Sequence, residues 1–197
     1  MPREAHEIIP ADIMDMADYG VIRKDSRAKV TAMKKSRRVH IGPDATFYFE
    51  SYETMWHQVH EMLHIEKGGA DQIEDELSAY NPLIPNGREL VATLMFEIDD
   101  PVRRANFLAG LGGVEETVSI RFAGLEVRGV PEEDVDRTTA DGKASSIQFL
   151  HFPFTDAAAA AFKAPGTEVQ LVIGHEKYGH IAILPDAVRA ALAADFD

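Results

Sequence analysis

The stretch LVATLMFEI, residues 90–98, places the strongest constraint on the fold of this chain. Successive side chains of a β-strand point to opposite faces, so a strand with one wet face alternates apolar and polar residues. This stretch is apolar at nearly every position. A strand at the edge of a sheet cannot cover both faces, and we therefore predict that residues 90–98 form a central strand.

Turn and capping residues divide the rest of the chain into helices and short strands. Ser51, Asp100 and Thr155 are expected to cap helices, and Lys67-Gly68-Gly69 ends the helix that Ser51 begins. We expect a first helix over residues 11–35, with a possible break near Gly20. Further helices are expected at 52–66, 71–80, 101–111, after Thr155 and after Pro185. The expected strands are 39–41, 46–50, 117–122, 125–130, 145–152, 168–173 and 180–184.

This order of elements predicts an α+β fold in a single domain over residues 1–197. Residues 1–112 are expected to be rich in helices and residues 113–197 rich in strands. Segregated runs of helices and strands favour a mostly antiparallel sheet with helices packed on one face or end. A chain of 197 residues is long enough to bury a substantial core.

Composition excludes several classes of protein. The chain has no cysteine, so a metal site would have to use His, Asp or Glu. The start of the sequence has no apolar segment of the signal-peptide type, and no apolar run approaches the ~20 residues that span a bilayer. We therefore expect a cytoplasmic protein without a membrane partner. The net charge of −13 argues against general nucleic-acid binding.

The string HEMLH, residues 60–64, matches the zinc-peptidase pattern H-E-x-x-H. On a helix, His60 and His64 lie one turn apart and could share a zinc ion, and Glu61 could take a proton from metal-bound water. His57 and Glu53 fall on the same stripe. The apolar residues of this helix lie almost opposite, so the histidines would line a cleft, contact a partner or lie in water.

The surroundings of the string do not match those of a peptidase. In metzincins a glycine follows three residues after the second histidine and a third histidine three residues later, whereas this chain has Lys67 and Ala70 at those places. The flanking positions His57 and Glu66 are polar where zinc-peptidase helices pack in a core. Three interpretations stay open: a solvated polar stripe, a metal site of His57, His60, Glu61 and His64, and a peptidase site. The first is favoured.

Two further groups of residues could hold a metal. The segment HEKYGH, residues 175–180, places His175 and His180 on either side of a tight turn, where His151 could join them. Several carboxylates could in principle bridge a di-iron centre, but paired E-x-x-H motifs are not evident. For both groups, ordinary turn and surface roles are favoured over metal binding.

Eight of the 20 cationic residues lie between Arg23 and Arg38. On a helix, Arg23, Arg27, Lys34 and Arg38 would fall within about a 60° arc. A solvated face is the favoured interpretation, and a site for a phosphate, nucleotide or acidic partner is the alternative. The candidate anion-binding residues are Arg23, Arg27, Lys34, Arg37 and Arg38.

Three blocks together resemble the bacterial domain-of-unknown-function family three-five-zero-one: KKSRRVHIGPDATFYFES, QVHEMLHIEKG and DELSAYNPLIPNGRELVATLMFEI. The HEKYGH segment is similar to the H-x-x-Y-x-H ending of that family. The resemblance covers nearly the whole chain. It extends to Glu61 and Glu66 but not to the neighbouring histidines. The matching residues are Arg37, Arg38, Glu50, Glu61, Glu66, Glu76, Tyr80, Asn81, His175, Tyr178 and His180.

The resemblance implies an accessory role, because members are often encoded beside a rubrerythrin-like protein and an iron–sulfur oxidoreductase. Our leading hypothesis is an accessory or binding protein in an iron-linked redox or peroxide-defence system, with a redox protein as partner. A non-enzymatic role is favoured. The alternatives are a zinc-dependent hydrolase that uses the HEMLH helix and an anion- or nucleotide-binding module that uses residues 23–38. Cofactors and self-association stay open.

Overall fold

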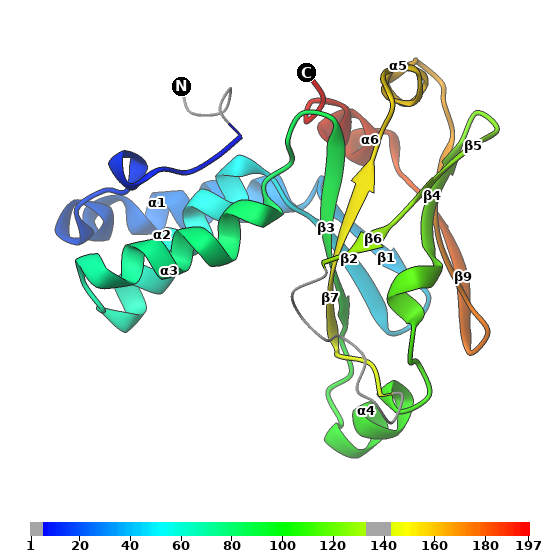
Figure 1. The fold of residues 1–197 in the computed structure, drawn as a ribbon, viewed down its shortest axis with the longest axis horizontal. Helices are drawn as coiled ribbons and strands as arrows, with labels where there is room; N and C mark the ends of the chain where they lie inside the picture. Colours follow the sequence, from blue (N-terminus) through cyan, green and yellow to red (C-terminus); the bar gives the residue numbers. More distant parts are fainter. Residues whose placement is uncertain (1–5, 133–142) are drawn as a thin grey trace.

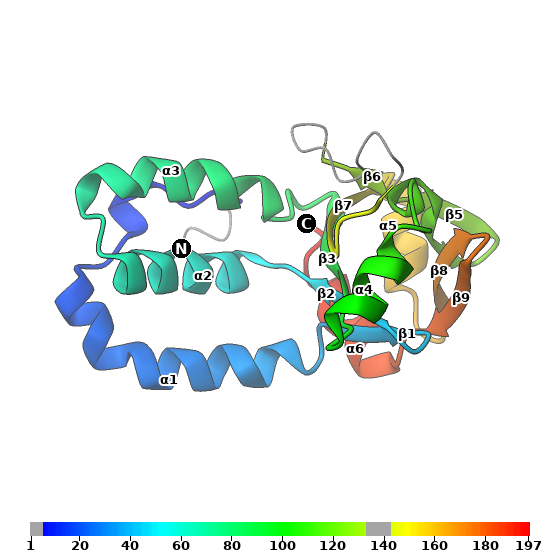
Figure 2. The ribbon, with the colours of Figure 1, turned by 90° about the horizontal axis from the view of Figure 1, so that it is seen from below.

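A computed structural model describes residues 6–132 and 143–197 of the chain. A body of strands carries an arm of three helices on one side (Figure 1). Figure 2 shows these helices side by side, with the middle helix between the other two. The arm contains α1 (Met16–Lys34), α2 (Tyr52–Glu66) and α3 (Ala70–Tyr80), preceded by the 3₁₀ helix η2 (Pro10–Asp12).

The body contains two antiparallel sheets. The first sheet has the order β1-β2-β3-β7-β6 and the second has the order β5-β4-β8-β9. Strands of the first sheet are β1 (Arg38–Ile41), β2 (Ala45–Phe49), β3 (Glu89–Phe96), β6 (Val130–Pro131) and β7 (Ile147–Pro153). Strands of the second are β4 (Val118–Phe122), β5 (Leu125–Arg128), β8 (Val169–His175) and β9 (Tyr178–Ile183).

The body also contains shorter helices. These are α4 (Pro101–Leu108), α5 (Asp156–Lys163), α6 (Asp186–Ala193), η3 (Asn81–Leu83) and η4 (Val114–Thr117). In Figure 1, α5 and α6 lie at one end of the body and α4 lies at the other. The predicted α+β class with antiparallel pairing is confirmed.

Strand β3 is apolar on both faces because each face meets a different core. Leu90 and Leu94 belong to the large cluster between the two sheets, where Phe47 and Phe152 are also fully buried. Val91, on the opposite face, belongs to the cluster that joins the arm to the first sheet. The strand lies at the centre of the five-stranded sheet, as the sequence predicts.

The first helix differs from its prediction at three places. It begins at Met16 rather than near Ala11, because the Asp15 carboxylate accepts the backbone N–H of Ala17 and caps the helix there. It runs through Gly20 without a break, and it ends at Lys34. Arg38 therefore lies on β1 and not on the helical arc. Within the described residues, no helix has both the length and the apolar character needed to cross a membrane.

Candidate functional site

The middle of the polar stripe of α2, formed by His57 and Glu61, faces α1. On α1, Tyr19, Arg23 and Ser26 lie at the spacing i, i+4 and i+7, which places them on one face of the helix. That face meets His57 and Glu61 of α2. The interpretation of a solvated stripe is therefore wrong for this part of the helix. The residues of HEMLH form the contact between the first two helices of the arm.

Glu61 is the centre of this contact. Its carboxylate accepts the Tyr19 hydroxyl at 2.8 Å, the Arg23 Nε at 2.8 Å and the Arg23 Nη2 at 2.9 Å. The Arg23 hydrogen bonds are the main reason why the pKa of Glu61 falls from 4.5 to about 2; burial opposes them and the Tyr19 hydrogen bond adds to them. Burial, followed by the contact with the Glu61 carboxylate, raises the pKa of Tyr19 well above its ordinary value.

His57 adjoins the same cluster. Its Nδ1 lies 3.1 Å from the Tyr19 hydroxyl and 3.1 Å from the Ser26 hydroxyl. Because Tyr19 donates its single proton to Glu61, its contact with His57 requires a proton on Nδ1. Burial lowers the pKa of His57; Glu61 opposes this effect, and the cations of α1 add to it. The imidazole is therefore a neutral hydrogen-bond donor at neutral pH.

His60 is completely buried, and both of its ring nitrogens are engaged. Its Nδ1 donates to the Trp56 carbonyl at 2.7 Å, and its Nε2 accepts the Met14 backbone N–H at 3.0 Å. The ring also stacks on Trp56 with 3.8 Å between centroids. Burial lowers its pKa, so the ring is neutral. A neutral imidazole has one lone pair, and here Met14 occupies it, so none is left for a metal in this arrangement.

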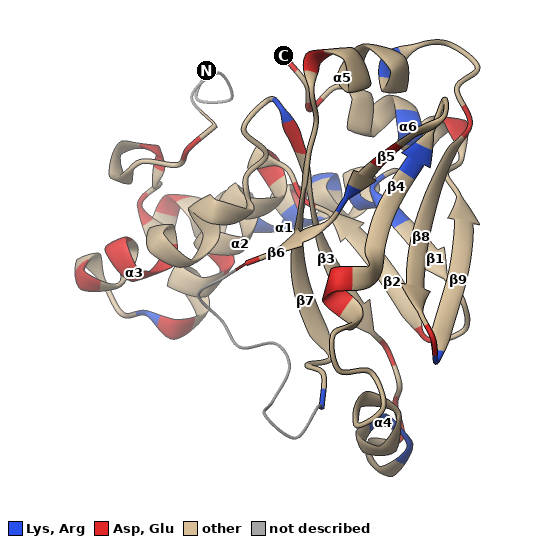
Figure 3. Ribbon diagram, turned by 45° about the vertical axis from the view of Figure 1, so that its right-hand side comes forward, with Lys and Arg blue, Asp and Glu red and all other residues tan. Residues whose placement is uncertain are grey.

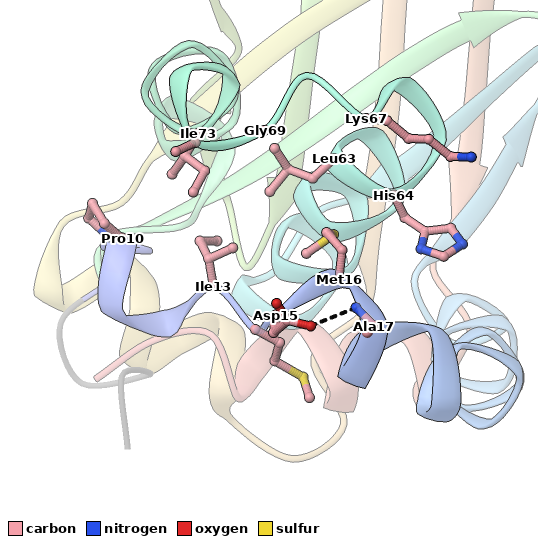
Figure 4. Close-up of a pocket in the computed structure, with 12 residues that line it drawn as sticks. Pro10, Ile13, Asp15, Met16, Ala17, Leu63, His64, Lys67, Gly69 and Ile73 are labelled. Carbon is pink, nitrogen blue, oxygen red and sulfur yellow. Dashed lines mark hydrogen bonds between the residues drawn. The ribbon is translucent and has the colours of Figure 1, made fainter.

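His64 borders a separate pocket near the tip of the arm (Figure 4). The pocket has a volume of about 650 Å³ and lies between the start of α1, the end of α2 and the start of α3. His64 approaches the Tyr19 ring edge-on at 5.8 Å. The three histidines of α2 thus have three different surroundings. Within the described residues, no three His, Asp or Glu side chains are grouped so that they could hold a metal.

The HEKYGH segment forms the β8–β9 turn. The His175 Nδ1 accepts the Lys177 backbone N–H at 3.2 Å. The Tyr178 hydroxyl donates to the Ile41 carbonyl at 2.9 Å and accepts the Asp44 backbone N–H at 2.9 Å, so it joins β9 to the β1–β2 turn. The His180 ring lies against Tyr178, with 4.3 Å between centroids. These contacts position the second sheet over the first.

His151 lies on β7 and has carboxylate partners. Its Nδ1 is 3.1 Å from Glu89, and its Nε2 is 3.7 Å from Glu132. The Glu89 hydrogen bond is the main reason that the pKa of His151 is raised, against the effect of burial. His151, His175 and His180, which the sequence left open as a group, do not form a metal cluster within the described residues.

The basic segment is divided among different roles. Arg23 binds Glu61, whereas Arg37 is buried and donates to the carbonyls of Phe49 and Glu50 and to the carboxylate of Asp195. The Arg38 guanidinium lies 4.9 Å from the Tyr48 ring centre. Of the five candidate anion-binding residues, Arg27 and Lys34 remain on α1 without an ion pair within the described residues. Lys24 of α1 and Lys35, the residue after its end, likewise form no ion pair within the described residues. We call these four residues the basic edge: Lys24, Arg27, Lys34 and Lys35.

The other family-matching residues hold elements together. Glu50 is buried and accepts the hydroxyls of Thr54 and Thr93, each at 2.8 Å. Asn81 pairs with both backbone groups of Ile8 at 2.9 Å, as a neighbouring strand would.

A second set of these contacts lies between α2 and α3. Gln72 of α3 donates to Glu66 of α2 and also to Glu76 of its own helix, each at 2.7 Å. Tyr80 contacts Gln58 through its hydroxyl at 3.5 Å.

Tyr19, Ser26 and Met14 are members of the cluster that the sequence did not single out. The spacing of Tyr19, Arg23 and Ser26 was an available signal, because it mirrors the stripe on α2. Met14 gave no such signal, because it contributes only its backbone N–H.

The chain is similar to known proteins in sequence and in fold. A family model described as "Protein of unknown function (DUF3501)" matches residues 7–196. The chain is also similar to a crystal structure of a protein of unknown function from Burkholderia pseudomallei. The two share 36% sequence identity and a TM-score of 0.89, over 96% of this chain and 99% of the other. None of the curated proteins compared matches this chain.

Proposed function

The chain belongs to the DUF3501 family, and from that premise we propose that it is an accessory protein that binds an acidic partner through its helical arm. The partner is a redox protein of an iron-linked, peroxide-defence system, as the family resemblance implies. One observation carries the proposal. Glu61 and His60 of HEMLH are engaged by Arg23, Met14 and Trp56. The basic edge, in contrast, forms no ion pair within residues 6–132 and 143–197.

The arrangement of charge on the arm supports an acidic partner. The basic edge lies along α1, where Lys24, Arg27 and Lys35 are exposed. On the other side of α2, α3 contains four acidic residues and no Lys or Arg (Figure 3). A chain with a net charge of −13 repels acidic proteins in general, so a local basic edge also fixes the orientation of binding.

Charge reversal tests the proposal directly. The triple variant Lys24→Glu, Arg27→Glu and Lys35→Glu changes exposed side chains only. We expect wild type at native expression to co-purify with a rubrerythrin-like or iron–sulfur protein. With that partner purified, the variant should bind about tenfold more weakly or worse at low salt, and the difference should shrink as salt is added.

Arg128→Glu on β5 is the matched control, because it introduces the same kind of charge change at an exposed site on the body. It should bind as wild type does. Recovery of no redox protein would overturn the proposal, and so would equal binding by the triple variant.

Elemental analysis of untagged protein separates the proposal from a zinc hydrolase that uses His60 and His64 as ligands and Glu61 as base. The proposal predicts no stoichiometric zinc. Stoichiometric zinc that disappears in His64→Ala, together with hydrolase activity lost in Glu61→Gln, would establish the hydrolase instead.

A further inference from the structure

A groove with a volume of about 560 Å³ lies between the first half of α2 and residues 22–33 of α1. It opens on the side of α1 opposite the basic edge, because its α1 residues differ in helical phase from Lys24 and Arg27. We call it the arm groove. Its lining residues on the arm helices include Ile22, Asp25, Lys29, Val30, Tyr52, Glu53 and Trp56.

The floor of the arm groove is apolar and aromatic. Trp56 is held in place because its Nε1 donates to the Asp12 carbonyl at 3.1 Å and because its ring stacks on His60. Val30 is buried beside it, and Ile22 remains 38% exposed. A fixed indole next to exposed aliphatic surface suits the flat or aliphatic body of a small ligand.

The rim of the arm groove is negative. Asp12, Asp25 and Glu53 line it, against a single cation, Lys29. Within the described residues, none of these carboxylates forms an ion pair with a Lys, Arg or His side chain. The lining of the groove therefore keeps an excess of negative charge over the single cation.

The pKa of Tyr52 responds to the same negative charge. Burial, followed by the negative charge of Asp12 and Glu53, raises the pKa of Tyr52 to about 12. Its hydroxyl is enclosed, and the Asp12 side chain is near enough to contribute a hydrogen bond to the raised pKa.

We propose that the arm groove binds a small organic cation, a primary ammonium group on an apolar body. The ammonium group lies among Asp12, Asp25 and Glu53, and the body lies on Trp56, where cation–π attraction adds to apolar contact. This site is separate from the basic edge and would select a ligand of opposite charge. Its failure would leave the proposed function untouched.

Trp56 is the only tryptophan in the chain, so its fluorescence reports binding in the arm groove directly. The probes are benzylammonium, the neutral benzyl alcohol and the anionic benzoate. We expect benzylammonium to give a saturable change in Trp56 emission. Benzyl alcohol should bind several-fold more weakly, and benzoate should give no saturation at the same concentrations, because the rim repels it.

Two variants remove rim charges one at a time. Glu53→Gln and Asp25→Asn should each weaken the binding of benzylammonium about two- to fivefold. This is the range for partly exposed charge pairs. Asp71→Asn on α3 is the matched control, because it removes an exposed carboxylate outside the groove. It should leave the dissociation constant unchanged.

Unchanged Trp56 emission and unfolding midpoint without ligand identify a variant as folded. If Glu53→Gln fails this check, exposed Asp25 supplies the same test. The proposal is overturned by the absence of saturation with benzylammonium, by equal binding of benzyl alcohol, or by undiminished binding in a folded rim variant.

Discussion

Arg23 on α1 donates two hydrogen bonds to Glu61 on α2, from Nε to Oε1 at 2.8 Å and from Nη2 to Oε2 at 2.9 Å. Both carboxylate oxygens are thus held by one guanidinium in the bidentate geometry. A general base works best when its pKa lies near the working pH. Glu61, with a pKa of about 2, is a weak base, and the pair is suited to joining two helices.

The first prediction concerns Glu61→Gln. Because the folded pKa lies below the ordinary value of 4.5, the Glu61 charge stabilises the fold above pH 4.5. That contribution is lost as pH falls from 4.5 to about 2. We expect Glu61→Gln to lower the free energy of unfolding at pH 7 by about 1 to 3 kcal/mol. Urea unfolding at pH 7 and pH 3 measures this.

At pH 3 the free energies of unfolding of wild type and Glu61→Gln should differ by less than at pH 7. At pH 3 the wild-type protein has already lost part of the stabilisation that the charge of Glu61 provides. Arg23→Gln, measured alone and with Glu61→Gln, gives the coupling energy of the pair. An equal gap at both pH values would show that the charge of Glu61 does not stabilise the fold.

The second prediction concerns His60. His60→Ala removes a buried ring and leaves the Met14 N–H without its acceptor, so we expect a loss of about 2 to 4 kcal/mol. His60→Gln can keep an acceptor near Met14 and should lose less. Calorimetry or urea unfolding ranks the two variants.

His60 also has a predicted pH signature. Its pKa is lowered in the fold, so the unfolded chain binds protons more readily. Stability should therefore decrease as pH falls below 6.5, the ordinary value for histidine. His60→Gln should remove this component. If stability depends on pH as steeply in His60→Gln as in wild type, the dependence comes from another histidine. His57 is one such residue, because its pKa is also lowered.

Local signals in the sequence were sufficient for the starts of three helices and for the place of β3, but not for the start of α1. Ser51, Asp100 and Thr155 each accept a backbone N–H at the start of the predicted helix. Such caps act within three residues of the chain, so the sequence alone can indicate them. The apolar run of β3 predicted its central place because burial of both faces leaves a direct pattern.

Contacts between distant segments were not predictable in the same way. The wheel of α2 placed Glu53, His57, His60 and His64 on one stripe, but it could not indicate that these side chains have different surroundings in the fold. The apolar residues of a helix indicate which face packs in a core. They do not indicate the contact with α1, because Tyr19, Arg23 and Ser26 meet α2 through polar groups. The division of the strands into two sheets is equally non-local, since it depends on which strands pair.

Arg37 gives the third prediction. Its side chain is 6% exposed, as is that of its partner Asp195, so removal of either residue leaves a buried charge. We expect Arg37→Ala to cost about 3 to 5 kcal/mol of unfolding free energy. Arg37→Lys should rescue little, because an ammonium group cannot reproduce the fork that also reaches the carbonyls of Phe49 and Glu50. Thermal unfolding measures the stability of both variants. Wild-type stability in Arg37→Lys would show that the forked geometry of the guanidinium is not required.

The fourth prediction concerns His151. Its pKa is raised by Glu89, so the charged ring stabilises the fold fully below pH 6.5, and this contribution is lost as pH rises through the folded pKa. Glu89→Gln should lower the pKa of His151, as measured by NMR titration of the ring. It should also remove stability below pH 6.5 and leave stability at pH 9 nearly unchanged. No shift in the titration would exclude Glu89 as the main cause.

The last prediction concerns Gly42 in the β1–β2 turn. It has φ +66°, and a Cβ there would lie 2.7 Å from the Tyr178 hydroxyl oxygen and 2.7 Å from the His180 Cδ2. Gly124→Ala is a matched control, because Gly124 has φ +76° with nothing within 4 Å of its Cβ. Both substitutions carry backbone strain of about 1 to 2 kcal/mol, and only Gly42→Ala adds overlap with the ring pair.

We therefore expect Gly42→Ala to lower the unfolding free energy by roughly 1 to 3 kcal/mol more than Gly124→Ala. Tyr178→Phe removes the hydroxyl that meets the new Cβ, so the double variant Gly42→Ala with Tyr178→Phe should lose less than the sum of the single losses. Urea unfolding of the four variants gives both comparisons. Equal losses for the two glycines would mean that the β1–β2 turn can move away from β9, and that Tyr178 does not hold the turn in place.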